Sequence, residues 1–126
     1  MKQKRWLLSW LLASVALCMQ AQQTAIKMVA DGHYRGAKQQ FERFLDDADE
    51  GEKGYEDSEA LLLVCDYVLG VPATADNIGE WTEENPLSQY AEILRVFRRN
   101  LLVKEQRFDE ALESFFDEEA KSVSID

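Results

Sequence analysis

The sequence predicts an all-α protein of three antiparallel helix hairpins, stacked as a short solenoid and preceded by a signal peptide. Apolar residues beyond the first 21 recur at spacings of three and four, the helical period, and no long stretch alternates as a strand would. The chain also echoes itself every 37 residues, and a fixed period between about 20 and 50 residues is typical of stacked repeats. The matched columns are Met28, Cys65 and Leu102; Tyr34, Val71 and Phe108; Ala37, Thr74 and Ala111; and Phe41, Ile78 and Phe115.

The N-terminal segment has the layout of a secretory signal peptide. Three basic residues, Lys2, Lys4 and Arg5, precede an apolar run from Trp6 to Met19. That run is shorter than the roughly 20 residues that a transmembrane helix needs. We therefore expect export and cleavage after Ala21, so that 1–21 is removed. An uncleaved membrane anchor is the alternative interpretation.

Cys18 offers a second processing route, as the lipidated cysteine of a bacterial lipoprotein. Such signals carry a small residue just before the cysteine, and this chain has Leu17 there. Lipidation is therefore the minority interpretation. Membrane association is expected only through lipidation at Cys18 or through an uncleaved signal.

The composition of the processed chain excludes some classes of partner. Cleavage after Ala21 leaves 105 residues with 11 basic and 24 acidic side chains, a formal net charge of −13. So acidic a chain repels nucleic acid and anionic membrane surfaces, and we expect neither as a partner. Cys65 is the only cysteine left, so no internal disulfide is expected and stability must come from packing.

The first predicted hairpin pairs a short helix over 22–30 with a helix from Tyr34 to Asp47. Gly32 lies in the break between them, and glycine is the usual residue for the left-handed turn after a helix. The inward face of the second helix is predicted to carry Ala37, Phe41, Phe44 and Leu45.

An acidic connector over 46–59 leads into the second hairpin. Its helices are predicted from Glu56 to Leu69 and from Ala73 to Glu84. The first of these is apolar nearly all round, which is typical of a helix buried between neighbours. Pro72 suits the first turn of the following helix, where a missing N–H costs nothing, and Pro86 ends the unit.

The third hairpin pairs a helix from Leu87 to Glu105 with a helix from Phe108 to Ala120, and the tail, 121–126, is expected to fray. The broad apolar stripe of the first helix is predicted to consist of Ile93, Leu94, Val96, Phe97, Leu101 and Leu102. The second helix places Phe108, Ala111, Leu112, Phe115 and Phe116 on one side.

This pattern resembles the tetratricopeptide repeat (TPR), a helix–turn–helix unit marked by a turn glycine, an aromatic residue, an alanine, a second aromatic residue and a closing proline. The implied repeat domain spans 22–120, in units of about 22–50, 55–86 and 87–120. Gln106 departs from the pattern, because it replaces the turn glycine of the third unit. The residues that define the repeat are Gly32, Tyr34, Ala37, Phe41, Pro86, Phe108, Ala111 and Phe115.

The segment from Asn85 to Ala91 is also similar to the joint between repeats in bacterial envelope proteins of this family. The resemblance implies a non-catalytic interaction module, located in the periplasm or at the outer-membrane periphery of a bacterium. In such a module the first helices of the hairpins line an inner face that binds a peptide or protein segment.

The candidate partner-binding residues lie on the fifth helix, which is basic in an acidic chain. Arg95 and Arg99 are one turn apart and could hold a carboxylate between them, with Asn100 and Lys104 close by. The alternative is that these cations pair with acidic neighbours on the surface, where ion pairs are common and weak.

Other classes of function stay open. If Phe115 and Phe116 are exposed at the end of the solenoid, the chain could be a structural segment that self-associates through its last helix, or the N-terminal part of a longer array. An enzyme or metal-binding protein is the least favoured class, and we expect no catalytic residue, metal or cofactor. His33 is the only histidine, Cys65 falls in a packed column, and the acidic loop at 47–51 lacks the glycine position and twelfth-position Glu of a calcium site.

Overall fold

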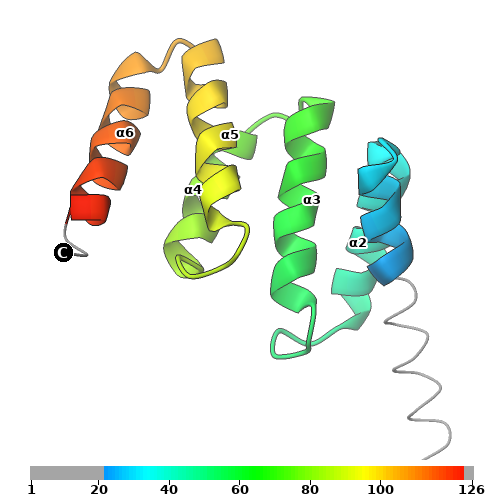
Figure 1. Cartoon of the computed structure of the whole chain (residues 1–126). Coiled ribbons are helices and arrows are strands. Elements are labelled where there is room, and N and C mark those ends of the chain that lie inside the picture. Colours follow the sequence, from blue (N-terminus) through cyan, green and yellow to red (C-terminus); the bar gives the residue numbers. More distant parts are fainter. Residues whose placement is uncertain (1–21, 124–126) are drawn as a thin grey trace, which may run out of the picture. The chain divides into compact units, whose positions relative to one another are not determined.

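The computed structural model confirms the all-α class over the residues that it describes, 22–123 (Figure 1). The predicted signal peptide, 1–21, and the end of the predicted tail, 124–126, lie outside the described residues. Within the described range the backbone forms six helices and no strand. They are a helix over 22–30, α2 (Tyr34–Asp47), α3 (Tyr55–Leu69), α4 (Thr74–Glu84), α5 (Ala91–Lys104) and α6 (Phe108–Val123).

The first four helices begin and end within one residue of their predicted bounds, but α5 starts four residues late. The segment before α5 forms turns instead of a first helical turn. The N–H of Ser88 donates to the carbonyl of Asn85 at 3.2 Å, and the N–H of Tyr90 donates to the Ser88 hydroxyl at 3.2 Å. Leu87 is almost fully exposed in these turns, so it contributes nothing to the core. At the other end, α6 continues to Val123, three residues beyond its predicted end.

Three helices end in the same left-handed turn. The residue with positive φ in each of these turns is Gly32 (84°), Gly70 (72°) or Gln106 (63°). In each case the next N–H closes the turn by donating to a carbonyl five residues back, which satisfies groups that the helix end leaves open. These N–H to carbonyl bonds join His33 to Met28 at 2.7 Å, Val71 to Asp66 at 3.0 Å and Arg107 to Leu102 at 2.7 Å.

The chain divides into two compact units, Met1–Cys65 and Asp66–Asp126, and the boundary falls inside α3. In the first unit the side-chain amide of Gln22 donates to the Gly54 carbonyl at 3.1 Å and to the Ser58 hydroxyl at 3.4 Å. These bonds fasten the helix over 22–30 to the start of α3. Among the described residues of this unit, those that are at most 1% exposed are Ala25, Ala37, Phe41, Ser58, Ala60 and Cys65.

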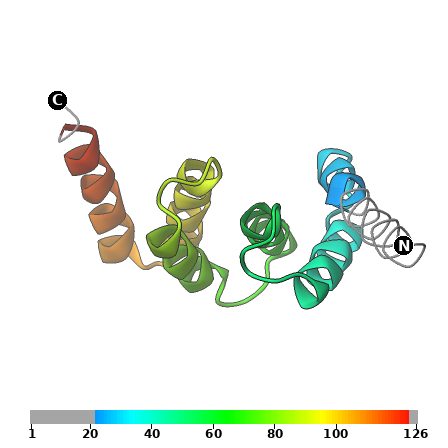
Figure 2. The ribbon, with the colours of Figure 1, turned by 90° about the horizontal axis from the view of Figure 1, so that it is seen from below.

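In the second unit α5 packs against both α4 and α6 (Figures 1 and 2). Ala75 of α4, Leu102 of α5 and Ala111 of α6 form one buried cluster, and Leu101 packs against it. The two alanines lie on either side of Leu102, and small side chains let helix axes approach closely. This contact among the three helices fixes the orientation of α5.

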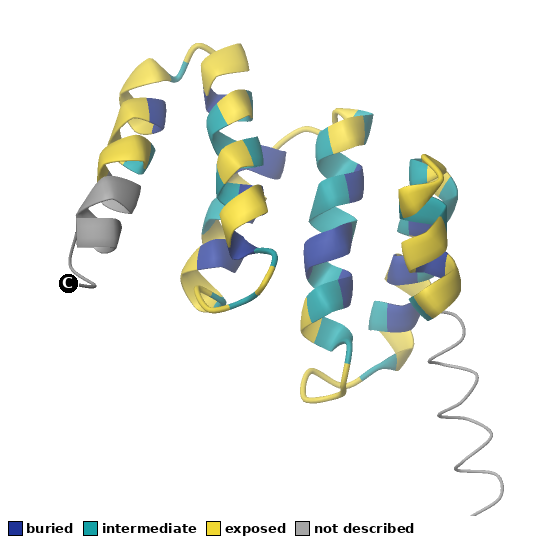
Figure 3. Cartoon of the chain, in the orientation of Figure 1, coloured by how far each residue is buried: buried dark blue, intermediate teal, exposed yellow. Residues whose placement is uncertain are grey.

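The column of small residues is buried in all three copies of the 37-residue period, because Ala37, Thr74 and Ala111 are each at most 9% exposed. The aromatic columns behave differently. Phe41 and Ile78 are completely buried, whereas their equivalent Phe115 is exposed, and Phe108 is also exposed. In Figure 3 most of the described part of α6 has the colour of exposed residues. The third copy therefore keeps the close-approach position of the repeat and leaves its aromatic positions uncovered.

Candidate protein-interaction surface

Helix α5 has two apolar sides. Leu94 and Leu102 are completely buried on the side that faces the core. On the opposite side, Ile93, Val96 and Val103 are 43%, 42% and 51% exposed. Positions 93, 96, 100 and 103 follow the helical period and so lie on one face. We call this face, with its neighbours, the α5 surface; it comprises Ile93, Val96, Phe97, Asn100, Val103 and Lys104 (Figure 3).

The α5 surface is fixed at one edge by a contact with the end of α3. The ring of Tyr67 stacks on the ring of Phe97, with centroids 4.1 Å apart and an angle of 3° between the ring planes. The amide of Asn100 donates to the Tyr67 hydroxyl at 3.3 Å. An aromatic pair of this kind contributes about 0.5–1.5 kcal/mol beyond its buried area. The geometry of Phe97 and Asn100 is therefore set before any partner arrives.

The charge of α5 is opposite to that of the chain as a whole. The helix carries four basic residues and one acidic residue, a net charge of +3. Two of the cations contact α6 of the same chain: Arg98 lies 4.0 Å from a carboxylate oxygen of Glu110, and the guanidinium carbon of Arg99 lies 5.8 Å from the ring centroid of Phe115. Lys104, in the last turn, is exposed at the end of the α5 surface.

The four residues that the sequence singles out for partner binding thus have different surroundings. Asn100 and Lys104 lie on the α5 surface, and Asn100 is held by Tyr67. Arg95 is half-buried on α5. Arg99 reaches the Phe115 ring on α6, an arrangement typical of a cation–π contact. The Arg98–Glu110 pair follows the alternative in which the cations of this helix pair with acidic neighbours.

The broad apolar stripe predicted for this helix divides between two sides of α5. Leu94 and Leu102 of that stripe are buried, whereas Ile93 and Val96 are exposed. The physical reason is the width of the apolar stripe around α5. Apolar residues from Ile93 to Leu102 wrap around more of the helix than α4 and α6 can cover. That width was the only signal in the sequence that pointed to a second apolar side.

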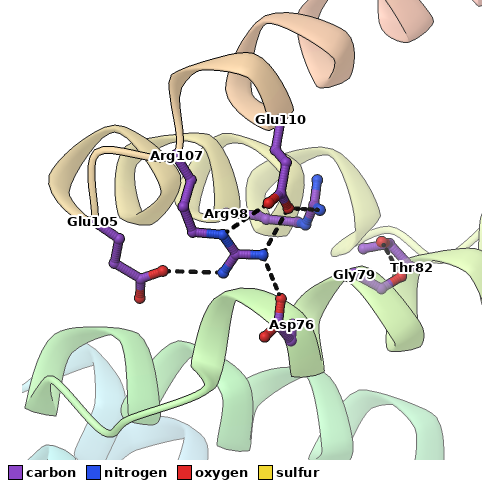
Figure 4. Close-up of polar contacts among 7 residues, drawn as sticks. All are labelled: Asp76, Gly79, Thr82, Arg98, Glu105, Arg107 and Glu110. Carbon is purple, nitrogen blue, oxygen red and sulfur yellow. Dashed lines mark hydrogen bonds and ion pairs between the residues drawn. The ribbon is translucent and has the colours of Figure 1, made fainter.

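Arg107, which lies in the turn between α5 and α6, is the centre of an ion-pair network (Figure 4). Its guanidinium donates to both carboxylate oxygens of Glu110, at 3.1 and 2.6 Å, to Glu105 at 3.1 Å and to Asp76 at 2.9 Å. These hydrogen bonds, led by the one with Glu110, raise the pKa of Arg107, and the bond from Arg107 lowers the pKa of Glu110. The network joins α4, the α5–α6 turn and α6, so its role is structural.

Gly79 of α4 lies beside this network, and the side chain of Arg98 packs against Gly79 (Figure 4). A Cβ atom at Gly79 would lie 3.0 Å from the Arg98 Nε, which is tighter than an ordinary contact. The glycine, which weakens a helix by about 1 kcal/mol relative to alanine, thus makes room for a side chain of α5. Thr82, one turn later, donates its hydroxyl to the carbonyls of Ile78 at 2.9 Å and Gly79 at 3.1 Å.

The described residues can also be compared with the requirements of a metal site and of a membrane-spanning helix. Among the described residues no group of three or more His, Cys, Asp or Glu side chains could hold a metal ion. Cys65 is completely buried, and His33 is exposed in the turn before α2. Over the same residues, no helix combines the length and the apolar character that crossing a bilayer requires. No protein-family model, curated protein or solved structure matches the chain.

Proposed function

We propose that the chain is an exported, non-catalytic protein-interaction module that binds a peptide or protein segment through the α5 surface. The observation that carries this proposal is the second apolar side of α5. Ile93, Val96 and Val103 are exposed in a row, on the side of the helix turned away from its own core. Apolar groups that recur in a row on a solvent-facing helix side are typical of an interaction site rather than of scattered surface residues.

The rest of the α5 surface supports the same function. Protein interfaces combine an apolar and aromatic centre with a polar rim. Here Val96 and Phe97 supply the centre, and Asn100 and Lys104 supply polar groups beside it. Because Phe97 and Asn100 are already held by Tyr67, binding would order few side chains, which lowers the entropic cost of association.

The chemistry of the surface defines the partner. Apolar side chains at helical spacing would cover Ile93, Val96 and Val103, as an amphipathic helix does when it lies in an apolar groove. A carboxylate on that segment would meet Lys104, the exposed cation of the α5 surface. We therefore propose an acidic, amphipathic segment as the ligand.

The fold proposed for this module is a short tetratricopeptide-like solenoid of three stacked hairpins, preceded by a cleaved signal peptide. Helix bounds that agree with the repeat pattern, and small residues buried at the same position of each period, support it. Location in the periplasm or at the outer-membrane periphery follows from the proposed signal and the resemblance to envelope repeats. The intact mass of the protein recovered from cells tests the export step, since cleavage after Ala21 leaves a chain that begins at Gln22.

The interaction itself is tested by quantitative co-purification from the producing cells. The baits are the unchanged protein, Val96→Glu on the α5 surface, and Asn77→Glu as a control at an exposed position of α4. We expect one protein to co-purify equally with the unchanged bait and with the control. Its recovery with Val96→Glu should fall at least tenfold, because a charge at the centre of an interface weakens binding strongly. Equal recovery with all three baits would contradict the assignment of the α5 surface.

A second candidate function is a structural segment that self-associates through α6. The observation that favours it is the exposure of four large apolar residues on that helix, Phe108, Leu112, Phe115 and Phe116. Monomeric proteins rarely expose a contiguous apolar patch of this kind without a partner.

A further inference from the structure

Helix α6 carries a second exposed apolar face. Phe108, Leu112 and Phe116 are one turn apart and are 59%, 56% and 57% exposed, and Phe115 beside them is 45% exposed. The rings of Phe115 and Phe116 meet edge to face, with centroids 6.1 Å apart. We call these four residues the α6 surface.

The 37-residue period places one residue of the α6 surface, Phe115, at a packing position. Phe115 is the equivalent of Phe41 and Ile78, and both of these are completely buried. In the first two copies of the period this position belongs to the core. In the third copy an aromatic side chain at this position is 45% exposed, so a position that is covered in the first two copies is not covered in α6.

The charges around the two exposed surfaces are opposite. The charged side chain of the α5 surface is Lys104, because Arg98 and Arg99 already contact α6 of the same chain. Asp109 and Glu113 are exposed one turn apart and adjoin Leu112 and Phe116 along the helix. Two α6 surfaces brought together would place acid against acid, which opposes association. An α6 surface placed on an α5 surface would place these acids near Lys104 and apolar residues against apolar residues.

We propose that the α6 surface of one copy of this chain docks on the α5 surface of a second copy. This inference rests on the proposed function, because it names the acidic, amphipathic segment that the α5 surface binds. The two surfaces differ, so the contact is heterologous. A pair of copies still has one free α5 surface and one free α6 surface, and the unchanged protein can therefore grow beyond a dimer or close into a ring.

The test uses the processed protein as exported and three single variants. Val96→Glu disables the α5 surface, Phe116→Glu disables the α6 surface, and Asn77→Glu adds the same charge at an exposed site outside both. All three positions are exposed, so folding is preserved, which circular dichroism on heating checks for each variant. Sedimentation velocity then gives the mass of each protein, alone and mixed, over a wide range of concentration.

The expected pattern depends on which surface each variant keeps. The unchanged protein and Asn77→Glu gain mass with concentration beyond that of a dimer, while Val96→Glu and Phe116→Glu each stay monomeric. When the two monomeric variants are mixed, a one-to-one dimer appears and grows no further, because one variant supplies an α6 surface and the other an α5 surface. Raising the salt from about 0.05 to about 0.5 M weakens association several-fold by screening the charges.

Three results would overturn the proposal. The first is a Val96→Glu protein that still forms a dimer and gains no mass when it is mixed with Phe116→Glu, which would indicate contact between two α6 surfaces. A mixture of the two variants that stays monomeric would exclude the α6-on-α5 contact. An unchanged protein that is monomeric throughout would exclude a second copy as the ligand. If co-purification nevertheless finds a different protein that is lost with Val96→Glu, the proposed function survives and only this inference fails.

Discussion

Leu102 and Val103 are neighbours on α5 with opposite surroundings. Leu102 is completely buried between Ala75 and Ala111, while Val103 is exposed on the α5 surface. Helical geometry turns each residue about 100° from the last, so neighbours on a chain can belong to different sides of a helix. Which of two apolar neighbours is covered depends on the helices packed nearby, and the sequence of α5 alone does not contain that information.

Truncation at these two positions should therefore have different effects. Leu102→Ala removes buried methyl groups and leaves a cavity, and we expect it to lower the free energy of unfolding by about 2–5 kcal/mol. Val103→Ala, its matched control, should change it by less than about 0.5 kcal/mol. Urea unfolding followed by circular dichroism measures both. Similar losses for the two variants would mean that Val103 also packs in the core.

The Arg107 network makes stability depend on pH. The hydrogen bond from Arg107 lowers the pKa of Glu110, so the folded protein holds this proton less readily than the unfolded chain does. The stabilisation is thus fully present above the ordinary glutamate pKa and is lost as the pH falls through the lowered pKa of the folded state. Glu110→Gln should therefore lower the unfolding midpoint at pH 7, and the difference from the unchanged protein should shrink in acid.

The control for this prediction is Glu113→Gln, an exposed acid on the same helix, which takes no part in the network around Arg107. Unfolding in urea at a series of pH values compares the two variants. If the midpoint difference between Glu110→Gln and the unchanged protein stays constant from neutral to acidic pH, the ionised carboxylate of Glu110 does not contribute to stability. The Asp76–Arg107 contact spans 31 residues of sequence, so only the tertiary structure could show it.

At the scale of elements, the ends of the helices follow from turn chemistry. Gly32 and Gly70 adopt the left-handed conformation that glycine allows without steric cost, and the sequence predicts both breaks. Gln106 adopts the same conformation with a side chain, which costs roughly 1–2 kcal/mol. The third copy of the repeat thus keeps the geometry of the turn although it lacks the expected glycine.

Two substitutions test this interpretation in opposite directions. Gln106→Gly should raise the free energy of unfolding by about 0.5–1 kcal/mol, because relief of strain exceeds the entropic cost of glycine. Gly70→Ala should lower it by about 1 kcal/mol or more, because the new Cβ meets no atom within 4 Å and only backbone strain remains. Thermal unfolding measures both. A destabilised Gln106→Gly would mean that the glutamine side chain matters more than its backbone.

The start of α5 shows where turn chemistry misleads. Pro86 was expected to close one unit and let the next helix begin at Leu87, but hydrogen bonds at Ser88 hold two further turns, and the helix begins at Ala91. Periodicity identified all six helices in the described range because each has at least one apolar face. It did not show that α5 and α6 carry more apolar surface than their own unit covers.

At the scale of the whole molecule, the period of 37 residues and the compact units divide the chain differently. The boundary between units lies between Cys65 and Asp66, inside the predicted middle hairpin. The period is nevertheless visible in burial, since its small-residue column is covered in every copy. Export, processing and the stacking of three hairpins stay predictions, because they concern 1–21 and the arrangement of the units.

The exposed sides of α5 and α6 link the proposed stacked repeat to the proposed function. A stacked repeat offers surface rather than a catalytic pocket, and repeat proteins use such extended surfaces to bind partners. Among the residues that the structure describes, most of the large apolar side chains that are exposed lie on two helices of opposite net charge. The central claim is that the side of α5 opposite the core binds another polypeptide.

The most direct measurement is photo-crosslinking in the producing cells from a benzoylphenylalanine residue placed at position 96. A matched protein carries the same residue at position 77, which is also exposed on a helix. We predict a defined covalent complex from position 96 and none from position 77, and a complex of twice the chain mass would identify a second copy. No complex from position 96, or the same complexes from both positions, would contradict the claim.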